Sequence, residues 1–161
     1  MTCNKKSAHS SSTSHPLSRY YFKGPTGVPS QFVDVATLDT LQAKVRTALS
    51  HAVVSSHGIQ LGETSSAFDG GTPNVSDSFA STFGWVDKLG LSSRLGLSRV
   101  VRQQLCCGAA YDLLQARGHR PTPDYWATLL WKRLMGTRVL AVRGDDQPGR
   151  SLRTHPAHHE P

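Results

Sequence analysis

The stretch Gly58-Ile59-Gln60-Leu61-Gly62-Glu63-Thr64-Ser65-Ser66 places a glutamate where a short apolar strand enters a turn of small residues. Asp69-Gly70-Gly71 follows, so the turn continues as a loop. A carboxylate at a strand exit is typical of barrel enzymes, because their active sites lie on the loops after the C-terminal ends of the strands. A solvated side chain or a cap on the next helix would also explain Glu63. The pattern alone leaves both interpretations open.

The segments around this strand alternate between strand and helix patterns. Strands are expected at residues 20–22, 59–63, 97–105 and 139–142. Helices are expected over residues 34 to about 54, from about Val75 with Asn74 or Ser76 as N-cap, and from Thr122-Pro123-Asp124. Such alternation favours parallel β/α units. Three units cannot close an eight-stranded barrel, so the pattern indicates either a small open α/β domain or part of something larger.

The periodicity of each helix predicts the side chains that face the core. The expected apolar stripes are Val35, Leu38, Leu41, Ala43, Val45, Ala48, Leu49 and Ala52 in the first helix, Phe79, Phe83, Val86 and Leu89 with Leu91 as a further candidate in the second, and Tyr125, Leu129, Leu130, Leu134 and Met135 in the third.

The chain has 161 residues, enough for one ordinary domain with a core. Its net charge of +7 suits an acidic partner such as a sulfated or carboxylated polysaccharide. The basic residues are dispersed, however, so a solvated basic surface is the alternative interpretation. No nucleic-acid-binding motif is recognised, and nucleic acid is not predicted as a partner.

Three cysteines, Cys3, Cys106 and Cys107, do not make the pattern of a disulfide framework. No C-x-x-C or His/Cys metal spacing occurs, so we predict no metal and no other cofactor. No transmembrane segment is predicted, because no run of about 20 apolar residues occurs. Residues 1–15 lack the apolar stretch of a secretory signal. The sequon at Asn74 would matter only in a secretory compartment.

An ordered series of motifs resembles the heparanase family. The series is Leu61-Gly62-Glu63-Thr64-Ser65-Ser66-Ala67-Phe68, Ser76-Asp77-Ser78-Phe79-Ala80, Trp85-Val86-Asp87-Lys88-Leu89-Gly90-Leu91, Val100-Val101-Arg102-Gln103, Pro123-Asp124-Tyr125-Trp126, Leu130-Trp131-Lys132-Arg133-Leu134-Met135-Gly136-Thr137 and Val139-Leu140-Ala141. A single Gly-Glu-Thr would be a weak signal, whereas this series, in family order and at compatible spacing, is specific. The resemblance extends more loosely back to Tyr20.

The resemblance implies a retaining endo-β-glucuronidase that cleaves heparan sulfate or a related acidic glycosaminoglycan. It also implies an α/β fold, a (β/α)8 TIM barrel with an appended β-sandwich. The chain would hold the last three or so β/α units and the start of the sandwich, and the missing N-terminal half of the barrel would be a candidate partner. Expected divisions are a disordered segment over residues 1–18, a partial barrel over 19–142 and a polar, disordered tail over 143–161. The family is secreted, lysosomal and matrix-associated.

The resemblance also assigns roles to particular positions. The family's nucleophile falls on Glu63, and its substrate-binding positions fall on Tyr20, Phe68, Asp69, Gly70 and Tyr111. The family usually has tyrosine followed by glycines where this chain has Phe68 and Asp69. An added carboxylate beside an anionic sugar should weaken binding by on the order of 1 kcal/mol. The stretch at residues 106–110 and the pair Ser18-Arg19 also depart from the family pattern.

A retaining glycosidase needs a second carboxyl group, about 5 to 5.5 Å from the nucleophile, as acid/base. In the family this residue belongs to an Asn-Glu-Pro motif on an earlier strand. In this chain the nearest echo is His159-Glu160-Pro161, in the polar tail, and Asp69 is a less favoured stand-in. We therefore expect this chain alone to be inactive. The alternative function is that of a non-catalytic, basic heparan-sulfate-binding or interaction fragment.

Overall fold

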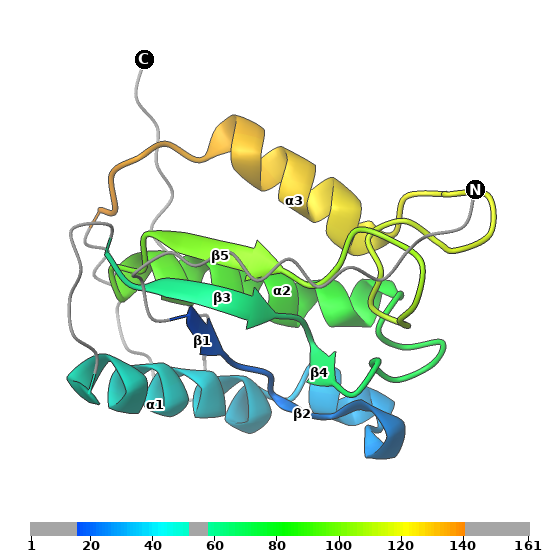
Figure 1. Cartoon of the computed structure of the whole chain (residues 1–161), viewed down its shortest axis with the longest axis horizontal. Coiled ribbons are helices and arrows are strands. Elements are labelled where there is room, and N and C mark those ends of the chain that lie inside the picture. The colour runs from blue at the N-terminus through cyan, green and yellow to red at the C-terminus, as the bar shows by residue number, and fades with distance from the viewer. Residues whose placement is uncertain (1–15, 52–57, 141–161) are drawn as a thin grey trace, which may run out of the picture.

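The architecture is a parallel sheet with helices packed around it, seen in a computed structural model that describes residues 16–51 and 58–140. The sheet order is β1 (Pro16–Ser18), β3 (Gln60–Thr64), β5 (Arg99–Arg102), and both pairings are parallel. Along the chain, α1 (Val35–His51) precedes β3, α2 (Phe79–Arg94) precedes β5, and α3 (Pro123–Leu134) follows it. Figure 1 shows α2 behind β3 and β5, with α1 below β1 and α3 above β5. The predicted alternation of parallel β/α units is confirmed.

This mixed α/β arrangement does not form a closed barrel within the described residues, because the sheet ends at β1 on one side and β5 on the other. A second, two-stranded parallel sheet pairs β2 (Phe22–Lys23) with β4 (Ala67–Phe68). It continues β1 and β3 beyond their C-terminal ends, and two short 3-10 helices follow β2, at Gly24–Thr26 and Pro29–Phe32. The extension builds a rim at that end of the sheet. None of the helices in the described part of the chain is both long and apolar enough to cross a membrane.

Helix α1 begins where the sequence predicts. The Asp34 carboxylate accepts hydrogen bonds from the Thr37 N–H at 2.8 Å and the Thr37 hydroxyl at 2.7 Å, which satisfies a donor at the helix start. These bonds lower the pKa of Asp34. Leu38, Leu41 and Val45, at helical spacing, are buried in the core beneath β3. Val35 and Ala43, also expected on this stripe, are exposed. The predicted end near residue 54 lies outside the described residues.

Helix α2 differs from the prediction in its start and in its buried face. It begins at Phe79 with Ser78 as N-cap, not at Val75 with Asn74 or Ser76. The reason is local: residues 72–78 form tight turns, and the buried Ser76 hydroxyl accepts the Thr72 N–H at 2.9 Å instead of capping the helix.

The apolar stripe expected for α2 was wrong for most of its members. Phe79 is 66% exposed and Phe83 55% exposed, and Val86 is also exposed, whereas Leu89 and Leu91 are buried as expected. The helix instead turns a face of small and polar residues toward the sheet. Gly84 permits a close approach to α1, because a Cβ there would lie 3.2 Å from the Leu38 side chain. Periodicity missed this face because serine, threonine, glycine, lysine and aspartate alternate on it with Trp85, Leu89 and Leu91.

Helix α3 begins as predicted, with Thr122 as N-cap and Pro123 in the first turn. Two members of its expected apolar face, Leu130 and Leu134, are exposed. The strand expected at residues 139–142 is absent through residue 140, and the remaining two positions lie outside the described residues.

The predicted terminal segments are only partly covered by the structure. Pro16–Ser18 forms β1, although disorder was expected through residue 18. Residues 1–15 and the tail over residues 143–161 lie outside the described residues.

A buried ion pair joins β5 to α3. The Arg102 guanidinium donates to the Asp124 carboxylate at 2.8 Å, and both side chains are less than a tenth exposed. The Thr82 hydroxyl donates to the other Asp124 oxygen at 2.8 Å, and Arg102 also donates to the Tyr111 carbonyl at 2.8 Å. Burial raises the pKa of Asp124, and Arg102 and Thr82 oppose that change. The pair therefore needs both partners to be tolerated in the interior.

We predict that Arg102→Met lowers the free energy of unfolding by about 3–5 kcal/mol, because it leaves a buried carboxylate without its counter-charge. The double variant Arg102→Met/Asp124→Leu should recover about half of that loss or more, since replacing both charges removes the desolvation cost. Urea unfolding followed by circular dichroism measures both changes. Arg99→Met, at an exposed position of the same strand, is the matched control and should change stability by less than about 0.5 kcal/mol. A loss below 1 kcal/mol for Arg102→Met would contradict this account.

Candidate active site

Three neighbouring strands deliver polar side chains to one edge of the sheet. Glu63 lies near the C-terminal end of β3, Tyr20 follows β1, and Gln103 follows β5 directly. Because the strands are parallel, their C-terminal ends meet at the same edge, and Ser18 of β1 is in register with Glu63. The Glu63 side chain is exposed, as a carboxylate that contacts a substrate must be.

The Tyr20 hydroxyl donates a hydrogen bond to Glu63 Oε1 at 2.9 Å. Burial raises the pKa of Tyr20 far above the ordinary tyrosine value, and the hydrogen bond to Glu63 and the nearby Tyr111 act in the same direction. The phenol therefore keeps its proton at neutral pH and remains a donor to the carboxylate. Among the residues that the structure describes, Tyr20 is the hydrogen-bond donor to the Glu63 carboxylate.

Gln103 links the two phenols of this edge. The Tyr20 hydroxyl makes a short contact with the Gln103 side-chain oxygen, and the Tyr111 hydroxyl lies 3.3 Å from the same atom. A phenol has one proton, so Tyr20 cannot donate fully to both Glu63 and Gln103. In the other orientation of the Gln103 amide, its nitrogen faces the two phenol oxygens and donates one proton to each. Tyr20 can then donate its own proton to Glu63. No role was predicted for Gln103, because it lies inside the strand expected over residues 97–105, whereas β5 ends at Arg102.

Aromatic rings surround the phenol that contacts Glu63. The Tyr20 ring meets the Phe68 ring edge-on, with centroids 6.4 Å apart, and lies 6.3 Å from the Tyr111 ring. Tyr111 is buried, and its pKa is raised by that burial, with the charges of Glu63 and Asp112 adding to the effect. The predicted residues Tyr20, Glu63, Phe68 and Tyr111 are thus brought together.

The fully buried Lys88 of α2 lies beneath this group. Its ammonium donates to the Thr64 hydroxyl at 2.8 Å and to the Ser65 carbonyl, the two residues after Glu63. It also lies 4.4 Å from the centroid of the Tyr21 ring and 6.0 Å from that of Tyr20, within range of a cation–π interaction. Lys88 was not singled out from the sequence, because a lysine on a helix is most often solvated.

Asp69 and Gly70 lie on the rim instead, in a loop with left-handed backbone. Asp69, Gly70 and Gly71 have φ values of 64°, 87° and 82°. Gly71 packs so closely that a Cβ there would lie 2.9 Å from the Tyr111 ring, and the Gly70 carbonyl accepts the Ala110 N–H at 2.7 Å. These contacts join the loop after β3 to the loop after β5. Between them is an open cavity of about 510 Å³, lined by Pro25, Asp69, Gly70, Gly71, Pro73, Gly108, Ala109, Ala110, Asp112 and Ala116.

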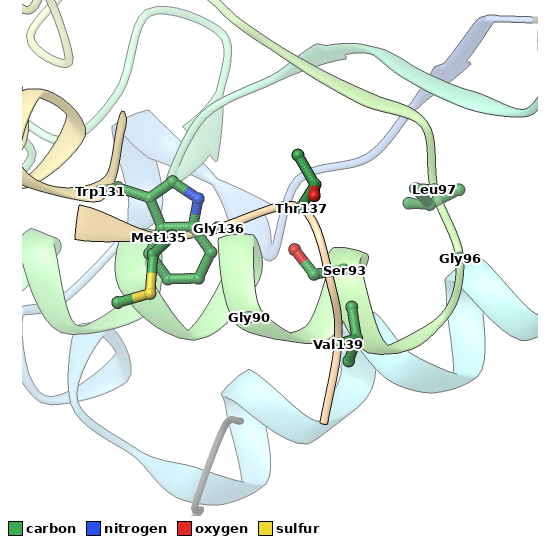
Figure 2. A pocket seen from close by; sticks show the side chains of 9 residues that line it. All are labelled: Gly90, Ser93, Gly96, Leu97, Trp131, Met135, Gly136, Thr137 and Val139. Carbon is green, nitrogen blue, oxygen red and sulfur yellow. The ribbon is translucent and has the colours of Figure 1, made fainter. Parts of the chain in front are cut away.

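A second cavity, of about 260 Å³, lies between the C-terminal parts of α2 and α3. Figure 2 shows Ser93 and Thr137 facing it, with Trp131 and Met135 at one end. Gly96 and Leu97, at its border, precede β5, so this cavity lies toward the amino end of the sheet. None of the residues predicted to bind substrate lines it, and we do not assign it to the site of Glu63.

One further group was not expected from the sequence. The ligand atoms of Cys106, Cys107 and His119 lie within 4.8 Å of one another, although no metal was predicted. The loop after β5 brings together residues whose spacing in the chain matches no common metal motif.

A parallel α/β sheet with a carboxylate at its carboxyl edge is consistent with part of a glycosidase domain. No protein-family model matches the chain. Its sequence is 38% identical over 138 residues, 84% of the chain, to heparanase of Gallus gallus, of which it covers 26%. It is 36% identical over 83% of the chain to hyaluronoglucuronidase of Hirudo nipponia, covering 28% of that protein. It is 34% identical over 83% of the chain to inactive heparanase-2 of Homo sapiens, covering 24%.

The chain is therefore heparanase-like over more than four fifths of its length, and the resemblance stated from the motif series is confirmed. It spans about a quarter of the length of the curated relatives it matches.

We predict that Tyr20 ionises well above pH 10, the ordinary tyrosine range, whereas an unfolded chain titrates there. Because the folded state holds this proton more tightly than the unfolded chain does, the phenol's contribution to stability is complete below about pH 10 and is lost as the pH rises further. Phenolate absorbance against pH measures the ionisation, with circular dichroism to verify folding. Tyr20→Phe should remove the step at highest pH, and Glu63→Gln should move it to lower pH. If all four tyrosines ionise together near pH 10, Tyr20 is not in the buried, hydrogen-bonded environment described here. An unchanged Tyr20 step in Glu63→Gln would argue against the contact with Glu63 itself.

Proposed function

We propose that the chain carries part of the active site of a heparanase-like glycoside hydrolase, with Glu63 as the nucleophile. The reaction is retaining endo-hydrolysis of β-glucuronidic bonds in heparan sulfate. The observation that supports this most directly is the Glu63 carboxylate at the carboxyl edge of a parallel sheet, with the protonated Tyr20 hydroxyl 2.9 Å from Oε1. The names of the heparanase and hyaluronoglucuronidase relatives support the class of reaction.

In this mechanism the Glu63 carboxylate attacks the anomeric carbon and the glycosidic bond breaks as the leaving oxygen takes a proton. Water then hydrolyses the covalent glycosyl ester, which returns the carboxylate to Glu63. Tyr20 holds one oxygen, Oε1, so that attack proceeds through Oε2. Because Tyr20 remains protonated, it adds no negative charge beside an anionic sugar. Gln103 and Tyr111 keep the Tyr20 ring in place.

The second carboxyl group of this mechanism is the acid/base. The chain has only two glutamates, and Glu160 is next to last in the sequence. We propose that the acid/base belongs to other β/α units of a (β/α)8 barrel, of which β1, β3 and β5 are the last strands, followed by a β-sandwich. On this proposal the partial barrel begins at β1, before the boundary at residue 19 that the sequence predicted, and includes α3. Its partner is the remaining half, and the chain alone does not turn over substrate.

The cavity between the loops at Asp69–Gly71 and at residues 108–110 is the proposed glycan subsite. Asp69 lines this cavity, Phe68 precedes Asp69 in the chain, and both side chains are exposed. Lys23 lies 3.8 Å from the Asp69 carboxylate, so a basic side chain that would meet a sulfated sugar is partly neutralised. By family, the proposed location of action is the cell exterior, the matrix or the lysosome.

A second candidate function is non-catalytic binding of the same polysaccharide. It is favoured by Phe68 and Asp69, which depart from the family pattern at proposed sugar contacts, and by the likeness to a relative named inactive heparanase-2. The net charge of +7 would support such binding without a reaction.

We predict that a chimera of Gallus gallus heparanase that carries this chain in place of the matching stretch releases reducing ends from heparan sulfate. Glu63→Gln should lower kcat of the chimera by at least about 10³-fold, because the amide cannot form the covalent intermediate. The control Asp34→Asn removes a carboxylate but keeps the helix cap, and should leave kcat unchanged.

The chain alone, assayed in parallel, should release no reducing ends. Turnover by the chimera that survives Glu63→Gln would contradict the nucleophile assignment. A folded but inactive chimera that still binds heparan sulfate would favour the non-catalytic candidate.

We predict that Asp69→Asn strengthens binding of the chain to heparin about fivefold, because it removes a like charge and releases Lys23. Isothermal titration at two salt concentrations measures the change. Asp34→Asn makes the same change in net charge away from the proposed subsite and should alter the affinity much less. Equal effects of the two variants would show that only overall charge matters.

A further inference from the structure

The loop after β5 brings two thiols and an imidazole to one point. Cys106 Sγ lies 2.9 Å from Cys107 Sγ, and the three possible ligand atoms, including that of His119, lie within 4.8 Å of one another. In a tetrahedral site with Zn–S near 2.3 Å, ligand atoms are separated by roughly 3.5 to 4 Å. The observed cluster is therefore close to the spacing of a metal site, and small side-chain rotations would complete it.

Adjacent cysteines do not ordinarily share a ligand. In an extended backbone, successive side chains point to opposite sides. Cys107 instead has φ of 78°, in the left-handed region that non-glycine residues seldom adopt. This conformation reverses the chain at Cys107, so that both thiols face the same side and His119 can approach them.

The backbone around the cluster is fixed by contacts that involve none of the three side chains. The Leu114 N–H donates to the Leu105 carbonyl at 2.8 Å. This bond joins the residue before Cys106 to the segment that leads into the turn with His119. The Gln115 N–H donates to the Arg120 carbonyl at 3.0 Å, which closes the turn that carries His119. The Asp112 carboxylate accepts the N–H groups of Gly108 and Ala109 at 2.9 and 3.2 Å, just after the cysteines. The backbone that carries the three ligands is thus fixed before any ion binds, and only side-chain rotations remain.

The chemistry of the donors selects the ion. Thiolate and imidazole nitrogen favour Zn²⁺ or a softer ion over Mg²⁺ or Ca²⁺, which take oxygen ligands. The cysteines are partly buried and His119 is exposed, so an ion can enter from solvent. We propose that Cys106, Cys107 and His119 bind one Zn²⁺ as two thiolates and one imidazole, with water as the fourth ligand. Binding releases the two thiol protons. It also links the turn at His119 to the loop after β5, whose residues 108–110 line the proposed glycan subsite.

The test uses the full chain, reduced and stripped of metal, and needs no glycan. Zn²⁺ is titrated against a chromophoric chelator, and Co²⁺ is added separately as a spectroscopic probe. We expect one Zn²⁺ per chain and, with Co²⁺, thiolate-to-metal charge-transfer bands together with the intense visible bands of four-coordination. Cys107→Ser and His119→Gln should each weaken Zn²⁺ binding by more than about 100-fold, because removing a ligand costs more than removing an outer-shell partner.

Two controls separate this cluster from other donors. Cys3→Ser removes the remaining cysteine, and a triple variant replaces His155, His158 and His159 with alanine; both should keep the affinity of the parent chain. Circular dichroism of each metal-free variant verifies its fold, and His119→Gln, at an exposed position, tests the site if Cys107→Ser does not fold. The proposal is overturned if Zn²⁺ affinity is unchanged in Cys107→Ser and His119→Gln, if it is lost in the triple histidine variant, or if Co²⁺ shows no thiolate bands.

Discussion

The buried ammonium group of Lys88 is the interaction on which the candidate site depends. It donates to the Thr64 hydroxyl and the Ser65 carbonyl at the end of β3, and its Nζ lies 3.4 Å from the Arg19 carbonyl after β1. Burial, with the nearby positive charge of Arg102, lowers the pKa of Lys88 well below its ordinary value. An amine in such a place is tolerated only because backbone and hydroxyl oxygens surround it. It therefore fixes two strand ends at the spacing that lets Tyr20 reach Glu63.

The polar interior explains why the helices pack as they do. Lys88 and the Arg102–Asp124 pair lie between the sheet and the helices, and the Arg102 guanidinium lies 4.6 Å from the centroid of the Trp85 ring. Helix α2 must present Lys88 and Trp85 to these partners, so Phe79 and Phe83 are turned outward. The hydrogen bonds of Lys88 and Arg102 determine which face of α2 is buried, although two phenylalanines are exposed as a result. Leaving a buried charge without a partner costs more free energy than exposing apolar surface.

The chain combines family-like and divergent features at the same edge of the sheet. The carboxylate, the two phenols and the glycine loop form one connected set of contacts, from Tyr20 through Tyr111 to Gly71. Phe68 is an exposed residue of β4, and Asp69 and the cysteine pair occupy the loops after β4 and β5, so none of these positions belongs to the buried core. This separation is physically reasonable, since loops on a packed scaffold tolerate substitution and determine what is bound. The two adjacent thiols give one of these loops a capacity for metal chemistry that the glycosidase assignment does not use.

The sequence by itself determined the alternation from α1 to α3, the parallel β/α class, the starts of α1 and α3, and the placing of Glu63 at a strand exit, because caps, prolines and the strand-to-turn change are local signals. It did not predict β1, and it expected a strand at residues 20–22 where β2 holds only Phe22–Lys23. The motif series also identified the relatives. Only the tertiary structure decided that α2 buries Lys88 rather than Phe79, that Gln103 contacts two phenols, and that His119 meets Cys106 and Cys107. These contacts join residues that are distant in the chain, or they bury polar side chains that need a partner from another element. No local pattern specifies them.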